Sequence, residues 1–188
     1  MTTKSQIVAW SKWLSWALRH DPTAAGLTLD QAGWTSVDAV LAAAELQSQA
    51  MTRADLDQVV ATSDKKRFAY SEDRKSIRAN QGHSVPVDLG LAPQTPPLRL
   101  FHGTAARFVQ QILREGLQRQ ARHHVHLTGD PTTAATVGSR HGNPLVLEVD
   151  AHRMHDDGHV FYCSDNGVWL VEAVPPRYLS QWGPHGTD

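Results

Sequence analysis

Apolar residues near the start of the chain recur at the three- and four-residue spacing of a helix. The first apolar face is formed by Ile7, Trp10, Leu14, Ala17 and Leu18. This spacing predicts a helix that ends just after Arg19-His20, because Asp21-Pro22 cannot continue it. Two further helices are predicted from their caps. Thr35-Ser36 precedes Val37, Val40 and Leu41, and Thr52 precedes Leu56, Val59 and Val60, with Asp55 in the capping-box position.

Alternating side chains follow the third predicted helix. Residues 67–70 and 76–79 alternate between polar and apolar, and the polar residues 72–75 separate them. This pattern predicts a β-hairpin. Three helices followed by a hairpin is the order of elements in a winged helix.

The chain then changes character at residues 91–97, which contain three prolines. Prolines so close together favour a stiff connector, since they continue neither a helix nor a central strand. We therefore predict a lobe at residues 1–92, a linker at 93–97 and a second lobe at 98–188.

The second lobe is predicted to mix strands and helices. Strands are expected at 98–102, 124–127, 145–149 and 168–171, with a weaker one at 160–162. Helices are expected at 105–115, closed by Gly116, and at 131–140, where Asp130 is the predicted N-cap and Gly142 follows the end. The fold class predicted for the whole chain is α+β, with the second lobe built around a small sheet.

Composition places the protein among globular chains. It has 188 residues, of which 40% are hydrophobic, and one cysteine, which excludes a disulfide framework. The first residues lack the apolar core of a signal peptide, and no run of 18 apolar residues occurs. We therefore expect a soluble, cytoplasmic protein with no membrane partner.

The charge balance excludes a globally basic nucleic-acid-binding surface. There are 18 lysines and arginines against 19 acidic residues, a net charge of −1. Five of the 18 are lysines, so 13 are arginines, the side chain that grips phosphate through two donors. Eleven histidines add groups suited to proton transfer near neutral pH.

Local charge is concentrated at two places in the first lobe. Arg19-His20 ends the first predicted helix, where two cations either complement the helix dipole or hold one anion. The predicted hairpin carries six cations against two acids, so it is either a solvated wing or a wing tip that contacts a nucleic-acid backbone. The six cations are Lys65, Lys66, Arg67, Arg74, Lys75 and Arg78.

A third candidate lies in the second lobe. His102-Gly103-Thr104 falls between a predicted strand and a predicted helix, which would place backbone N–H groups and a hydroxyl where phosphate or pyrophosphate binds. These three places together indicate a protein that handles phosphate.

The histidines also raise the question of a metal. His124 and His126 have a spacing that can chelate zinc, but a third ligand would be Asp130 or His141 and no HExxH motif occurs. We therefore predict no metal site. The stretch with His152, His155 and His159 reads as a surface loop, and Cys163 as an idle thiol.

Taken in order, many short segments resemble the RNA 2′-phosphotransferase family, also called tRNA 2′-phosphotransferases. In the first lobe these are Ser11-Lys12-Trp13-Leu14-Ser15, Leu18-Arg19-His20, Gly26-Leu27-Thr28-Leu29-Asp30, Gly33-Trp34, Lys66-Arg67-Phe68, Ile77-Arg78-Ala79 and Gln81-Gly82-His83-Ser84. In the second they are His102-Gly103-Thr104, Arg122-His123, Val125-His126-Leu127, Gly138, Arg140-His141-Gly142 and Asn166-Gly167-Val168-Trp169-Leu170. The resemblance covers residues 11 to 179.

The resemblance implies a winged-helix RNA-binding lobe and an ADP-ribosyltransferase-like lobe that binds NAD as a co-substrate. Such enzymes act in tRNA splicing and RNA repair on an internal RNA 2′-phosphate. The phosphate first attacks the nicotinamide riboside carbon and expels nicotinamide. The ribose 2″-hydroxyl then attacks phosphorus, which gives 2′-hydroxyl RNA and ADP-ribose 1″,2″-cyclic phosphate. We expect the enzyme to work as a monomer.

The resemblance also assigns roles to residues. The catalytic quartet corresponds to Arg19, His20, Arg67 and Arg122, of which the first three would grip the 2′-phosphate and Arg122 would act in the second step. Cofactor contacts are expected from His102, Gly103, Thr104, His126, Arg140 and Val168. RNA contacts are expected from Lys65, Lys66, Arg78, His83 and Ser84. One departure is Arg74, in a hairpin turn where the family often carries glycine.

Three other functions remain open at this stage. One is a non-catalytic winged-helix protein that binds nucleic acid. Another is an ADP-ribosyltransferase that modifies nucleic-acid 5′-phosphate ends. The last is a metal-dependent phosphoesterase that would ignore NAD.

Overall fold

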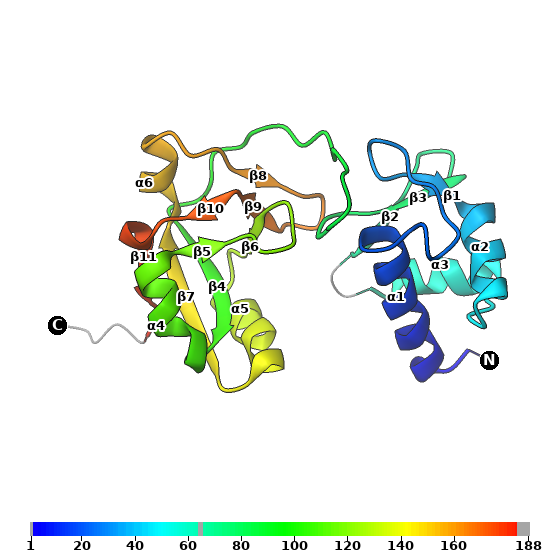
Figure 1. Ribbon diagram of the computed structural model, residues 1–188, viewed down its shortest axis with the longest axis horizontal. Helices are drawn as coiled ribbons and strands as arrows, with labels where there is room; N and C mark the ends of the chain where they lie inside the picture. The colour runs from blue at the N-terminus through cyan, green and yellow to red at the C-terminus, as the bar shows by residue number, and fades with distance from the viewer. Residues whose placement is uncertain (1, 64–65, 184–188) are drawn as a thin grey trace. The chain divides into compact units, whose positions relative to one another are not determined.

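The chain divides into two compact units, Met1–Gly90 and Leu91–Asp188 (Figure 1). The computed structural model describes residues 2–63 and 66–183, and within the second range it does not describe the side chain of His141. Lys65, one of the expected RNA contacts, lies outside the described residues. Six α-helices and several small antiparallel sheets occur within the described ranges, so the fold is mixed α and β.

The three helices predicted in the first unit are confirmed. They are α1 (Lys4–Arg19), α2 (Val37–Leu46) and α3 (Arg53–Ala61). Ser36 caps α2 by accepting from the Ala39 amide, and Thr52 forms a capping box with Asp55 at the start of α3. The largest fully buried side chains of this unit come from all three helices and the sheet: Leu14, Leu18, Val37, Val40, Leu56, Val59 and Ile77.

A three-stranded antiparallel sheet completes the first unit. Strands β1 (Thr35–Ser36), β2 (Phe68–Tyr70) and β3 (Ser76–Ala79) pair in the order β1-β3-β2. The hairpin of β2 and β3 confirms the prediction. Strand β1 was not predicted, because Thr35-Ser36 reads as a helix cap. Ser36 belongs to both elements, because its side chain caps α2 and it also pairs with Ser76 in the register of β1 and β3.

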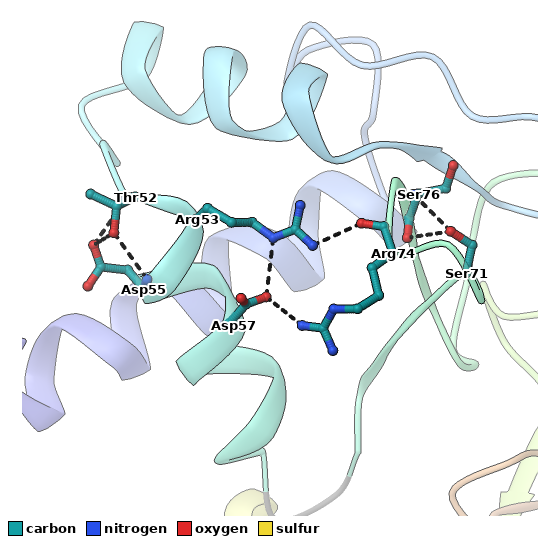
Figure 2. A network of polar contacts seen from close by, with 7 residues as sticks. All are labelled: Thr52, Arg53, Asp55, Asp57, Ser71, Arg74 and Ser76. Carbon is teal, nitrogen blue, oxygen red and sulfur yellow. Dashed lines mark hydrogen bonds and ion pairs between the residues drawn. The ribbon is translucent and has the colours of Figure 1, made fainter.

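A charged network ties the hairpin turn to α3 (Figure 2). The Asp57 carboxylate accepts from Arg53 at 3.3 Å and from Arg74 at 2.9 Å. Arg53 also donates to the backbone carbonyl of Arg74 at 2.9 Å. Arg74 itself has a φ of 58°, in the left-handed region that favours glycine. The turn therefore keeps a backbone conformation suited to glycine, and the arginine side chain contributes contacts with α3.

Residues 91–183 of the second unit contain two three-stranded sheets and one two-stranded sheet. One sheet has the order β11-β7-β4, the next has the order β6-β9-β8, and β10 pairs with β5. The strands are β4 (Arg99–Ala105), β5 (Leu117–Gln118), β6 (Val125–Leu127), β7 (Pro144–Asp150), β8 (Tyr162–Cys163), β9 (Trp169–Val171), β10 (Ala173–Val174) and β11 (Leu179–Gln181). An isolated bridge between Phe101 and Thr128 joins β4 to the residue that follows β6.

Three α-helices and two short 3₁₀ helices accompany these strands. They are α4 (Ala106–Glu115), α5 (Pro131–Gly138), η1 (Ser139–His141), α6 (Ala151–Asp156) and η2 (Pro176–Tyr178). As predicted, Asp130 caps α5 through the amides of Thr132 and Thr133, and Pro131 occupies the first turn. The core of this unit includes the fully buried Leu100, Leu147, Met154 and Phe161.

Two sequence-based expectations in the second unit were wrong. His102, Gly103 and Thr104 do not form a turn before a helix, because β4 continues through them and pairs with β7. His152 and His155 do not lie in a loop, because Asp150 caps the short helix α6 that contains them. In the first place the predicted strand ended too early, and in the second a short helix was missed.

Gly103 lets the helix α5 pack closely on β4. A Cβ on Gly103 would lie 1.7 Å from the carbonyl oxygen of Ala134 in α5, and one on Gly138 would lie 2.7 Å from that of Thr104. The two glycines therefore let α5 pack directly on the strand backbone. The close approach that a glycine permits is here an approach of helix to strand.

No helix in the described part of the chain combines the length and the apolar composition that are needed to cross a membrane.

Candidate functional site

The end of α1 brings two predicted site residues to a third. Arg19 is the last residue of α1 and His20 is its C-cap. One Nη of Arg19 donates to the carbonyl oxygen of Arg67 at 3.3 Å, and the guanidinium lies 5.8 Å from the ring centre of Phe68. Arg67 directly precedes β2, so the helix end and the start of the hairpin are held together.

The segment 80–84, for which composition predicts only a loop, forms hydrogen bonds with the end of α1 and with the residues just before β2. The Ser84 amide donates to the carbonyl of Arg19 at 2.9 Å. The Asn80 amide donates to the carbonyl of Arg67 at 2.9 Å, and its side-chain Nδ2 donates to the carbonyl of Lys66 at 2.6 Å. Asn80 is 6% exposed. Sequence reasoning missed Asn80, since a single asparagine in a polar stretch carries no distinct signal.

Ser84 also contacts the ring of His20. Its Oγ lies 3.0 Å from Nδ1 of His20 and 3.4 Å from the carbonyl oxygen of Arg19. The hydroxyl can accept from Nδ1–H of a neutral or protonated ring while it donates to the carbonyl, or it can donate to an unprotonated Nδ1. Nε2 of His20 carries a hydrogen when the ring is protonated, and also when a neutral ring accepts from the hydroxyl at Nδ1. In each case the contact holds the orientation of the ring.

The other expected RNA contacts of this unit lie in different surroundings. Lys66 is exposed. Arg78 is half-buried, with its guanidinium carbon 4.5 Å from the ring centre of Trp34 and one Nη 3.4 Å from the carbonyl of Ala32. His83 is 2% exposed, and a Cβ on Gly33 would lie 3.4 Å from its Nε2. His83 is thus a core residue beside the loop that carries Trp34.

In the second unit, three predicted residues form one hydrogen-bonded group. Nδ1 of His102 lies 3.0 Å from the backbone carbonyl oxygen of His126, which can only accept, so the ring carries its hydrogen on Nδ1. One Nη of Arg122 lies 3.2 Å from Nδ1 of His126 and donates to it. Arg122 is exposed, and the two histidines are half-buried.

Burial lowers the pKa of His102, and the positive charge of Arg122 lowers it as well, while the hydrogen bond to His126 offsets part of the shift. The ring is therefore neutral near pH 7. A neutral imidazole with its hydrogen on Nδ1 has an acceptor lone pair on Nε2. This group can bind a polar ligand through a neutral imidazole and a guanidinium side by side.

The remaining predicted cofactor residues are placed by the strands and helices around this group. Thr104 is buried on β4, and Gly103 packs against α5 as described above. Arg140 is exposed on η1. Val168 immediately precedes β9, and its carbonyl accepts from the amide and the hydroxyl of Ser164.

The histidines considered as zinc ligands have other neighbours. The ring of His124 meets Tyr162 edge-on at 5.6 Å between centres, and burial lowers its pKa. In residues 2–63 and 66–183, no three histidine, cysteine or acidic side chains are grouped so that they could hold a metal ion.

Comparison with known proteins gives a consistent result. The family model described as RNA 2′-phosphotransferase, Tpt1/KptA family, matches residues 5–173. A probable RNA 2′-phosphotransferase of Agrobacterium fabrum is 56% identical over 172 residues, which cover 92% of each chain. One from Rhodopirellula baltica is 50% identical over 181 residues, covering 96% of this chain and 98% of its own. One from Trichormus variabilis is 54% identical over 169 residues, covering 90% and 93%.

Proposed function

Because the chain belongs to the RNA 2′-phosphotransferase family of Tpt1 and KptA, which makes it a transferase, we propose that it removes an internal RNA 2′-phosphate by NAD-dependent transfer to ADP-ribose. The products of the proposed reaction are 2′-hydroxyl RNA, nicotinamide and ADP-ribose 1″,2″-cyclic phosphate. The observation that carries the proposal is the contact of Arg19 with the Arg67 backbone, with His20 next in sequence and held by Ser84.

These residues suit a phosphate that reacts twice. A guanidinium and an imidazole N–H at one helix end offer charge-assisted donors to the phosphate oxygens. A phosphate that is first nucleophile and then electrophile needs its orientation held and its charge compensated, which donors in fixed positions do well. In our proposal Arg19, His20 and Arg67 hold the 2′-phosphate of the RNA.

The second unit has a donor set that fits NAD. A dinucleotide presents a negatively charged pyrophosphate, ribose hydroxyls and aromatic bases. Arg140 supplies a cation for the pyrophosphate, and the neutral ring of His102 supplies an acceptor for a ribose hydroxyl. NAD would provide the electrophilic ribose carbon and the accepting hydroxyl of the transfer. We assign to Arg122 the compensation of charge at phosphorus in the second step.

The architecture of each unit supports the same proposal. The first unit has the element order α1-β1-α2-α3-β2-β3, which is that of a winged helix, and we propose that it binds the RNA. We propose that the second unit, with its two three-stranded sheets flanked by helices, is an ADP-ribosyltransferase-like lobe that binds NAD. In this proposal residues 93–97 are the linker between them.

The direct test is an RNA that carries one internal 2′-phosphate, incubated with the protein in the presence and absence of NAD. We expect 2′-hydroxyl RNA and the cyclic phosphate only when NAD is present. Release of phosphate without NAD would indicate a phosphoesterase and overturn the proposal. The same incubation with an RNA or DNA carrying a 5′-phosphate end reports the alternative transferase activity, because it would yield an ADP-ribosylated end.

A further inference from the structure

The outer face of the three-stranded sheet carries mostly polar side chains, of which Arg78 is an expected RNA contact. In the register of the sheet Ser36 lies opposite Ser76, and Ala69 lies opposite Arg78. These four residues alternate along their strands with the buried Thr35, Phe68, Ile77 and Ala79, so they share the face that points away from the core.

Trp34 stands at one edge of this face in a constrained position. Asp30 accepts from the Trp34 amide at 2.8 Å and from the Ala32 amide at 2.9 Å, and its own amide donates to the Trp34 carbonyl at 2.9 Å. The guanidinium of Arg78 packs on the indole at 4.5 Å. Turn and guanidinium together hold the indole in place, while part of its surface stays accessible.

An open groove of about 530 Å³ adjoins the indole. Its volume falls in the range of sites that hold small ligands, about 300–1,000 Å³. Its lining combines apolar surface with hydroxyl and carboxylate groups and includes Thr28, Leu29, Asp30, Trp34, Ser36 and Ser76. An aromatic surface beside hydrogen-bonding groups is the chemistry that recognises a nucleobase.

We propose that this groove receives one base of the RNA substrate, from a nucleotide near the one that carries the 2′-phosphate. The inference rests on the proposed function for the identity of the RNA. The Asp30 carboxylate favours a base over a backbone phosphate, because it repels phosphate but accepts from the amino groups of bases. A carboxylate also has more acceptor sites than the two amides occupy.

The position of the groove fits one continuous strand of RNA. The groove adjoins β1, and Arg67 precedes β2 at the other edge of the same sheet. Two strand spacings separate these edges, roughly 10 Å. Arg78 on the central strand β3 lies between them and supplies a positive charge for the connecting backbone.

Binding measured without NAD tests the site. A fluorescent single-stranded RNA with one 2′-phosphate is titrated with the full-length protein at fixed salt, and each base is replaced in turn by an abasic residue. We expect one abasic position to weaken binding by roughly 5- to 100-fold, the range of a base stacked on an aromatic ring. The intact RNA should bind Trp34→Ala more weakly by the same factor. In that variant, the abasic residue at this position should not weaken binding any further.

Two further variants separate the groove from the fold. Trp34→Phe keeps an aromatic surface and should retain most of the affinity. Thr28→Trp places a large ring at an exposed position of the lining and should block the groove while the core stays intact. Trp182→Ala, which removes an exposed tryptophan of the second unit, is the matched control and should bind as the unmodified protein does.

The outcomes distinguish this inference from the proposed function. If the protein is an active NAD-dependent phosphotransferase but Trp34→Ala and Thr28→Trp bind every RNA normally, the groove proposal is wrong and the function stands. If the abasic position and Trp34 are coupled but no transfer occurs with NAD, the function is wrong and the groove still binds a base. If thermal unfolding shows that Trp34→Ala is unfolded, Thr28→Trp and Trp34→Phe decide the question.

Discussion

The hydroxyl of Ser84 lies 3.0 Å from Nδ1 of His20, although 64 positions separate the two residues in the chain. A neutral ring that accepts from this hydroxyl at Nδ1 carries its hydrogen on Nε2. If Nε2–H of His20 donates to the 2′-phosphate, as we propose, Ser84 is a positioning residue for that donor.

Ser84→Ala should therefore lower kcat/KM in a pH-dependent way. At pH 8, where a free imidazole is neutral, we expect a loss of about 10-fold, the size of one hydrogen bond to a charged group. At pH 5.5 a protonated ring carries both hydrogens without help, so the loss should shrink to about 3-fold or less. Steady-state kinetics across this range provide the measurement.

Ser84→Thr keeps the hydroxyl and should restore the unmodified pH profile. The charged and titratable neighbours of the contact, Arg19 and Asp21 beside His20 and His83 beside Ser84, are unchanged in both variants. A loss in Ser84→Ala that is equal at pH 5.5 and pH 8 would contradict the role given to the hydroxyl.

Arg122→Ala should uncouple the two halves of the proposed reaction. The guanidinium is exposed beside His126 and is assigned to the second step, so nicotinamide release should persist while 2′-hydroxyl RNA forms about 100- to 1,000-fold more slowly, the usual effect of removing one electrostatic contact in a transition state. Parallel assays of nicotinamide and of the RNA product measure the two halves. An equal loss of both would place Arg122 in the first half of the reaction.

The secondary structure of the first unit was predicted more completely from the sequence than that of the second. In the first, the caps at Ser36 and Thr52 and the alternation of 76–79 are local signals, and the structure contains the helices and hairpin that they predict. In the second, Gly103 looked like a turn before a helix. Its actual role depends on Ala134 and Gly138, more than 30 residues away, which no local pattern reveals.

The candidate site shows the same limit. The short motifs indicated Arg19 and His20 from their type and order, yet the contacts that orient these two side chains come from distant residues. Asn80 and Ser84 reach the end of α1 and the start of β2 through backbone carbonyls, which any residue offers. Sequence reasoning therefore identifies the reactive groups more readily than the residues that hold them.

Gly103→Ala should destabilise the protein strongly. The added Cβ would lie 1.7 Å from the Ala134 carbonyl, so α5 must move away from β4, and we expect a loss of about 3 kcal/mol in the free energy of unfolding, at the upper end for overpacking. Gly129→Ala is the control, because a Cβ there meets nothing within 4 Å. Urea denaturation of both variants gives the comparison, and equal midpoints would show that α5 does not pack as described.

The lowered pKa of His102 predicts how stability depends on pH. An imidazole that is harder to protonate in the folded state than in the unfolded chain contributes stability above the unfolded pKa of about 6.5, and this is lost as pH falls toward the lower folded value. The free energy of unfolding should therefore drop between pH 7 and pH 5 by more in the unmodified protein than in His102→Gln. The other ten histidines are common to both proteins, so the difference isolates His102. Identical slopes would mean that His102 titrates normally.

Variants of Arg74 can separate the effect of backbone strain in the hairpin turn from the effect of its side-chain contacts. Its φ of 58° favours glycine, whereas its guanidinium binds Asp57 at 2.9 Å and lies 4.7 Å from the ring centre of Tyr70. Arg74→Gly relieves the strain and loses the contacts, each worth about 1 kcal/mol or less at an exposed site, so its unfolding free energy should change by less than about 1 kcal/mol. Arg74→Ala loses the contacts and keeps the strain, so it should be about 1 kcal/mol less stable than Arg74→Gly. Chemical denaturation ranks the three proteins. If the alanine variant equals the glycine variant, the turn has changed its backbone conformation and the account of Arg74 is wrong.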